Sequence, residues 1–83
     1  MGKKYEPLAT HLQGSGASRV SLSFDDVGGL VGGLPASADK WAAWWSNNQH
    51  HVQAKAWMQA GWKVANANLP ARTVEFTKVT SGS

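Results

Sequence analysis

The chain has 83 residues, with eight lysines and arginines against five acidic residues and no cysteine. This length predicts a single domain over residues 1–83, with an ordered core at 5–79 and a loose tail at 80–83. The missing cysteine excludes disulfides, thiolate metal sites and cysteine nucleophiles, and it favours a reducing cytoplasm. The net charge of +3 gives a mild preference for anionic partners, and no apolar run is long enough for a membrane span.

The first predicted element is a helix over residues 5–13. Tyr5, Leu8 and Leu12 fall on one face of it at helical spacing. Pro7 suits a position in the first turn, where no backbone N–H is needed. A loop rich in glycine and serine follows.

A half-buried strand comes next, because apolar and polar residues alternate strictly. We expect Val20, Leu22 and Phe24 to face inward. Ser23 then opens a capping pattern with Asp26, which predicts the start of a helix. Four glycines in and after this helix predict that it is short and held by packing.

The tryptophan-rich segment begins near Ser37, a plausible N-cap for a helix that ends at Trp45. Trp41, Trp44 and Trp45 stand at i, i+3 and i+4, so they would form one helical stripe. An extended backbone at Trp44 and Trp45 is the alternative, since aromatic residues favour strands.

Asn47 or Asn48 is expected to cap the next helix, and Gly61 to end it. Two strands follow at 62–69 and 72–78, and together they predict a C-terminal hairpin.

The order helix, strand, helix, helix, helix, strand, strand predicts an α+β domain. Three to four short helices would pack against a three-stranded antiparallel sheet. This is the order of a winged helix with one extra segment at 41–45, so we expect a winged-helix-like fold.

The chain has three short motifs, each present once: LPxSA at 34–38, WWxN at 44–47 and AWxxxGWxV at 56–64. With these motifs the chain resembles a family of small uncharacterised bacterial domains of unknown function. The resemblance covers roughly residues 5–78 and implies a domain that occurs alone or appended to larger proteins. It implies no activity. Where the family has a fuller amphipathic helix, this chain has glycines at 28–29.

A polar cluster, residues Asn47 to Gln53, lies between the tryptophan groups. Its amides and imidazoles suit base edges and phosphates. The alternative is that one asparagine caps a helix and the other side chains face water. The candidate nucleic-acid-binding residues, including flanking positions, are Ser37, Lys40, Trp41, Asn47, Asn48, Gln49, His50, Gln53 and Arg72.

Most of the tryptophans are expected in the core. Trp41 is the expected exception, because it adjoins Lys40 and could offer a ring to nucleic acid. Arg72 lies at the hairpin, where a wing would approach the minor groove. Further lysines that form either a phosphate-contacting rim or a solvated surface are Lys55, Lys63 and Lys78.

No pattern in the sequence indicates catalysis, a metal or another cofactor. Asp25 and Asp26 are neighbours that are better explained as helix caps than as a catalytic pair. His50 and His51 point to different sides of a helix, and neither they nor His11 have a ligand at i+4. We therefore expect no enzyme activity, metal, cofactor or small-molecule substrate.

The sequence thus predicts a non-enzymatic DNA-binding module, with DNA favoured over RNA as partner. Double-stranded DNA is the first expectation, read by the amides of the polar cluster. The alternative is a protein-interaction or oligomerisation module, such as a homodimer, that uses exposed tryptophan and the last strand as an open sheet edge.

Overall fold

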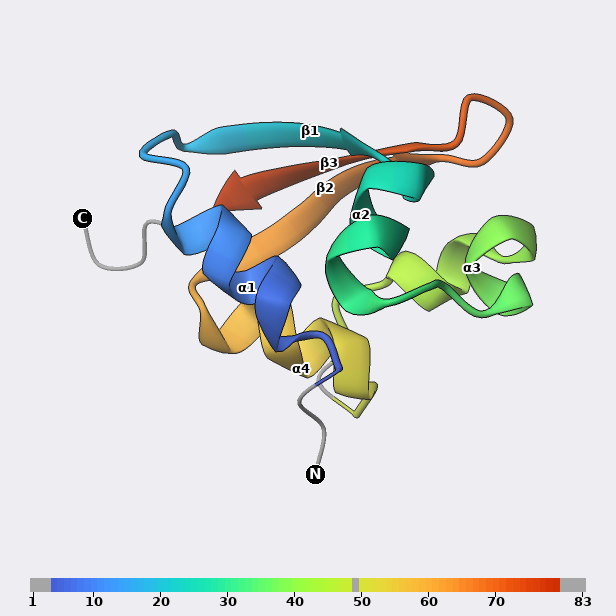
Figure 1. Ribbon diagram of the computed structural model, residues 1–83, viewed down its shortest axis with the longest axis horizontal. Coiled ribbons are helices and arrows are strands. Elements are labelled where there is room, and N and C mark those ends of the chain that lie inside the picture. The colour runs from blue at the N-terminus through green and yellow to red at the C-terminus, as the bar shows by residue number, and fades with distance from the viewer. Residues whose placement is uncertain (1–3, 49, 80–83) are drawn as a thin grey trace.

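The computed structural model of the chain describes residues 4–48 and 50–79 (Figure 1). Its elements in chain order are α1 (Glu6–Gln13), β1 (Arg19–Ser23), α2 (Phe24–Val31), α3 (Ala36–Lys40), the 3₁₀ helix η1 (Ala42–Trp45), α4 (Val52–Gln59), β2 (Trp62–Asn68) and β3 (Thr73–Lys78). The helices lie on one side of a three-stranded antiparallel sheet, so the predicted α+β class is confirmed. Within the described ranges, no helix is long and apolar enough to cross a membrane.

Helix α1 forms as predicted. Pro7 lies in its first turn, where a residue without an N–H is tolerated. Leu8 and Leu12 are fully buried, and Tyr5 is buried just before the helix begins. Burial of the phenol raises the pKa of Tyr5 above its ordinary value.

The junction of β1 and α2 is a tight corner. Ser23 Oγ accepts a hydrogen bond from the Asp26 N–H at 2.9 Å, and the Asp26 carboxylate accepts one from the Ser23 N–H at 3.2 Å. This confirms the predicted capping box. Phe24 was expected to end the strand but begins α2 instead, because the cap at Ser23 already starts the helix. Gly32 ends α2 with a φ of 79°.

The sheet has the strand order β1-β3-β2, so the last strand lies in the centre. Phe76 of β3 stands between Val20 of β1 and Val64 of β2. Phe76 and Val74 are fully buried against the helices, as predicted. The residues that alternate with them are polar and lie on the uncovered face.

The predicted continuous helix from Ala38 to Trp45, capped by Ser37, is wrong, and so is the alternative of an extended Trp44 and Trp45. Helix α3 begins directly after Pro35 and stops at Lys40, and Ser37 lies inside it without capping it. Trp41 is extended, with φ −125° and ψ 120°, and η1 follows as a separate 3₁₀ turn. The break lets the Trp45 ring turn back into the core, where its Nε1–H donates to the carbonyl of Ala38 at 2.9 Å.

Helix α4 is not capped by an asparagine, and that prediction is also wrong. His51 occupies the N-cap position without a side-chain hydrogen bond. The Asn48 side chain instead accepts from the His50 N–H at 2.9 Å in a local turn. Gly61 follows the end of α4 with a φ of 86°, which confirms it as the terminating glycine.

Stacked aromatic rings form the centre of the core. Trp45 lies parallel to Phe24 at 4.7 Å between ring centroids and parallel to Trp57 at 6.2 Å. Trp57 meets Phe76 edge-on at 5.5 Å. Trp62 is also buried, so the prediction that most tryptophans are core is confirmed. Aromatic area thus makes up a large part of a small core.

Candidate nucleic-acid interface

The segment formed by α3 and η1, residues 36–45, makes an elbow beside the body of the domain (Figure 1). Ser37, Lys40 and Trp41 are all exposed on it. The Trp41 side chain is the most open of the large apolar ones, with 64% of the residue exposed. Three of the predicted site residues therefore do lie together on the surface.

Asn47 has a different position from the one expected of a base reader. Its Nδ2 donates to the Val64 carbonyl at 2.9 Å, and its Oδ1 accepts from the Val64 N–H at 2.8 Å. The same Oδ1 accepts from the Trp57 Nε1–H at 3.0 Å. The amide thus completes the outer edge of β2 as a neighbouring strand would, and it satisfies the only polar atom of the buried Trp57 ring.

Gln53 is also engaged inside the domain. It is only 9% exposed, and its Nε2 donates to the Trp44 carbonyl at 3.0 Å. This bond joins α4 to η1. Because a base edge would have to replace it, Gln53 has a structural role here, as Asn47 does.

The remaining members of the polar cluster are more open. Asn48 and His50 are exposed and bonded to each other through the local turn. Gln49 lies outside the described residues. Asn47, Asn48 and His50 are thus all exposed, but of these three only Asn47 is bonded to distant elements of the domain.

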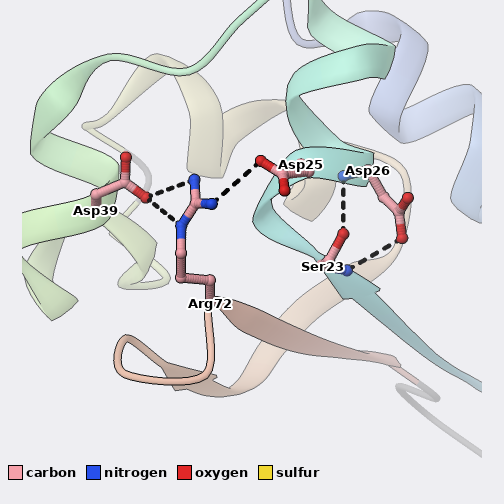
Figure 2. Close-up of polar contacts among 5 residues, drawn as sticks. All are labelled: Ser23, Asp25, Asp26, Asp39 and Arg72. Atoms are coloured by element: carbon pink, nitrogen blue, oxygen red, sulfur yellow. Dashed lines mark hydrogen bonds and ion pairs between the residues drawn. The ribbon is translucent and has the colours of Figure 1, made fainter.

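Arg72 lies in the hairpin turn and links three parts of the chain (Figure 2). Its guanidinium bonds the Asp39 carboxylate of α3 at 3.2 Å and the Asp25 carboxylate of α2 at 3.2 Å. Its carbonyl accepts from the Phe24 N–H at 2.8 Å, and its backbone has a φ of 55°. The hairpin turn is thereby tied to α2 and α3.

The carboxylates of Asp25 and Asp39 compensate the positive charge of Arg72, which we predicted to lie in a wing close to DNA. The pKa of Arg72 is raised, first by the hydrogen bond to Asp39 and then by the attraction of Asp25 and Asp39. A cation whose pKa is higher in the folded than in the unfolded state stabilises the fold fully at any pH below the unfolded-state pKa. This stabilisation is lost as the pH rises through the folded-state pKa. The guanidinium therefore stays charged at neutral pH, but its charge is used inside the domain.

Replacement of Arg72 by alanine is expected to lower the melting temperature measured by circular dichroism, because both ion pairs are lost and alanine is strained at this φ. Arg72→Gly should melt above Arg72→Ala, since glycine adopts a positive φ freely. Lys40→Ala serves as the control, because it removes an exposed cation that pairs with no described carboxylate. If all three variants have the same melting temperature, the ion pairs of Arg72 do not stabilise the fold.

A signal that the sequence reasoning missed is the distribution of acidic residues. From Lys40 to Val74 the chain has no aspartate or glutamate. This segment includes η1, α4 and β2, and it exposes Lys55 and Lys63 as well as Lys40. The hairpin turn belongs to the same run, but there Arg72 lies beside Asp25 and Asp39 of other elements. An acid-free run of this length is visible in the sequence and indicates where an anionic partner meets least repulsion.

A model of a domain of unknown function, DUF7662, matches residues 5–80. The chain belongs to the DUF7662 family. The match covers every element from α1 to β3, so the whole fold described above is the family's domain. No curated protein and no solved structure matches the chain. Family membership therefore fixes the domain and leaves its function to be inferred from the chemistry of its surface.

Proposed function

We propose that this DUF7662 domain binds DNA and has no enzymatic activity. The observation that carries the proposal is the acid-free segment between Lys40 and Val74. It exposes Lys40, Lys55 and Lys63, and no carboxylate pairs with any of the three among the residues that the structure describes. Unpaired lysines of this kind attract phosphates without losing an internal partner.

The arrangement of elements supports the same proposal. The order of elements is winged-helix-like: a helix, a strand, further helices and a C-terminal hairpin. The second strand of the hairpin, β3, also pairs with β1. In such a fold α4 corresponds to the helix that meets DNA. The hairpin differs from a free wing, because Arg72 ties it to α2 and α3. We therefore place the DNA on the side of α4 and the elbow rather than at the hairpin.

Sequence-specific reading by Asn47 and Gln53 is not part of this proposal. Both amides are bonded to other groups of the domain, Gln53 in a buried position and Asn47 in an exposed one, and freeing them would break the contacts described above. The proposed contacts are electrostatic, and their specificity is low.

Fluorescence anisotropy with labelled DNA at low salt tests the proposal. Phosphate contacts from Lys40 and Lys55 predict that log K falls with log salt concentration at a slope of about −1.4 to −1.8. Lys40→Gln and Lys55→Gln should each lower the affinity severalfold and reduce that slope by about 0.7–0.9. Lys63→Gln should change binding less, because Lys63 pairs with Thr77 and lies on the uncovered face of the sheet.

Lys4→Gln is the matched control, because it removes the same charge from a residue outside the segment, next to the Val31 carbonyl at 3.2 Å. It should leave the salt dependence nearly unchanged. If the domain binds neither single-stranded nor duplex DNA at low salt, or if all four variants weaken binding equally, the proposed surface is wrong.

A protein-interaction module is the second candidate, and one observation favours it. Trp41 is exposed beside Ala42 and Ala43, which are exposed as well. An open tryptophan is a frequent centre of protein interfaces. Light scattering over a range of concentrations would detect a homodimer, and Trp41→Ala should dissociate a dimer that uses this surface.

A further inference from the structure

We propose that Trp41 stacks on an unpaired base and that Lys40 contacts the adjoining phosphate, so that the domain prefers single-stranded to duplex DNA. This inference rests on the proposed DNA binding and deepens it. It concerns one ring and one cation at the joint between α3 and η1.

Trp41 differs from the other tryptophans in its surroundings. Trp45, Trp57 and Trp62 are buried, and Trp44 is half-buried against the core. Trp41 is 64% exposed, so most of the apolar area of its indole is available to a partner. The exposed ring is therefore the largest contact area that this surface offers.

The backbone that carries the ring is fixed on both sides. The Trp41 N–H donates to the Ser37 carbonyl at 2.9 Å, and the Trp41 carbonyl accepts from the Trp44 N–H at 3.1 Å. The Nε1–H of Trp45 fastens η1 to Ala38, as described above. A ring on a fixed backbone loses little freedom on binding, so more of the contact energy is available to the complex.

Two further contacts hold the elbow against the rest of the domain. Asp39 is bonded to Arg72 of the hairpin, and the carbonyl of Trp44 is bonded to Gln53 of α4. The elbow is thus attached to the hairpin turn and to α4. Gln53, predicted to read bases, and Arg72, predicted to lie in a wing, instead hold the elbow against the domain.

The charge around the ring favours a nucleic acid as the occupant. Lys40 precedes Trp41 directly, and after it no acidic residue follows until Glu75. Asp39 is the nearest acid in sequence, and its carboxylate is paired with Arg72 (Figure 2). Asp25 lies on the far side of the same guanidinium. A phosphate at Lys40 therefore meets a cation that pairs with no described carboxylate, and the neighbouring Asp39 is partly compensated by the guanidinium that it shares with Asp25.

The chemistry of the exposed groups favours an unpaired base over a base pair. Reading a duplex needs hydrogen-bonding groups at base edges, and the amides of Asn47 and Gln53 are used internally. What remains at the elbow itself is an aromatic face beside a cation, because the exposed Asn48 and His50 lie outside residues 36–45. Every base has a face on which such a ring can stack, but the faces are covered in an intact duplex.

The test uses the full chain and anisotropy with a short labelled oligothymidylate, the same oligomer with abasic sites, and a mixed-sequence duplex. Trp41→Ala should lower the affinity for oligothymidylate by about ten- to hundredfold. Trp41→Phe should retain much of it, whereas Trp41→Leu should behave as Trp41→Ala, because leucine is apolar but cannot stack. The abasic oligomer should bind wild type and Trp41→Ala equally.

Val52→Ala is the matched control, since Val52 is another exposed apolar residue and lies outside the elbow. It should bind oligothymidylate as wild type does. Circular dichroism should show that all variants keep the fold, because both positions are exposed.

The outcomes separate this inference from the proposal that it rests on. Duplex and oligothymidylate binding that is salt-dependent but independent of Trp41 would overturn the stacking and leave DNA binding intact. No binding to any of the three probes would overturn both. Self-association that needs Trp41, without any binding of DNA, would assign the ring to a protein partner instead.

Discussion

Trp45→Ala is expected to lower the free energy of unfolding by about 3–5 kcal/mol, measured by urea denaturation and circular dichroism. A chain of this length is stable by only about 4–12 kcal/mol in total. The variant should therefore unfold at a much lower urea concentration or fail to fold at ordinary temperature.

The size of the effect follows from the position of the ring. Trp45 is 1% exposed and lies between Phe24 of α2 and Trp57 of α4. Alanine would leave a cavity where three elements meet, and cavities of this kind cannot fully collapse. It would also leave the Ala38 carbonyl without its donor.

Two variants calibrate this prediction. Trp41→Ala makes the same chemical change at an exposed position and should alter stability by no more than about 0.5 kcal/mol. Trp45→Phe should lie between wild type and Trp45→Ala, because it keeps a stacking ring but loses the N–H donor. Similar losses from Trp41→Ala and Trp45→Ala would contradict the packing described above.

Several elements could be predicted because their signals are local. Ser23 and Asp26 lie three residues apart, and their side chains bond each other's backbone. Gly61 ends α4 because it alone adopts the required φ at no steric cost. The buried Val74 and Phe76 follow from strict alternation in β3. In each case the residues that decide the structure are neighbours in sequence.

The break at Trp41 could not be predicted from spacing. Trp41, Trp44 and Trp45 have the period of a helical stripe, and nothing in the segment stops a helix. The helix stops because Trp45 gains more from the core between Phe24 and Trp57 than an unbroken helix would give. Packing against distant elements overrides a local pattern of this kind.

The hydrogen bonds of Asn47 and Gln53 to other elements of the domain could not be predicted, for a related reason. Asn47 bonds residues that are 10 and 17 positions away, and Gln53 bonds one that is nine positions away. An amide has the same donors and acceptors for a base edge as for a peptide group. Sequence alone therefore shows that these side chains can form hydrogen bonds but not with what.

These contacts give the polar cluster a structural role in place of the predicted role in base recognition. Its most constrained members hold the elbow and the edge of β2, and the exposed group they help to position is Trp41. A surface that is built in this way presents a ring and cations rather than a set of amides. This difference is what separates stacking on unpaired bases from reading of a duplex.

Asn47→Ala should lower the free energy of unfolding by about 2–3 kcal/mol in urea denaturation. Three hydrogen bonds disappear, and the Trp57 Nε1–H is left buried without an acceptor. The N–H and carbonyl of Val64 can turn to water instead, which limits the loss. Asn47→Asp should be less harmful, since a carboxylate still accepts from Trp57 and from Val64.

Asn48→Ala is the control, because it makes the same change at the next residue, where the side chain serves only an exposed local turn. It should cost less than about 1 kcal/mol. At a temperature where all variants remain folded, Asn47→Ala should bind oligothymidylate and duplex with the affinity of wild type, because the amide is bonded to Val64 and Trp57. A variant that keeps its stability but changes its preference among bases would show instead that Asn47 leaves β2 to read DNA.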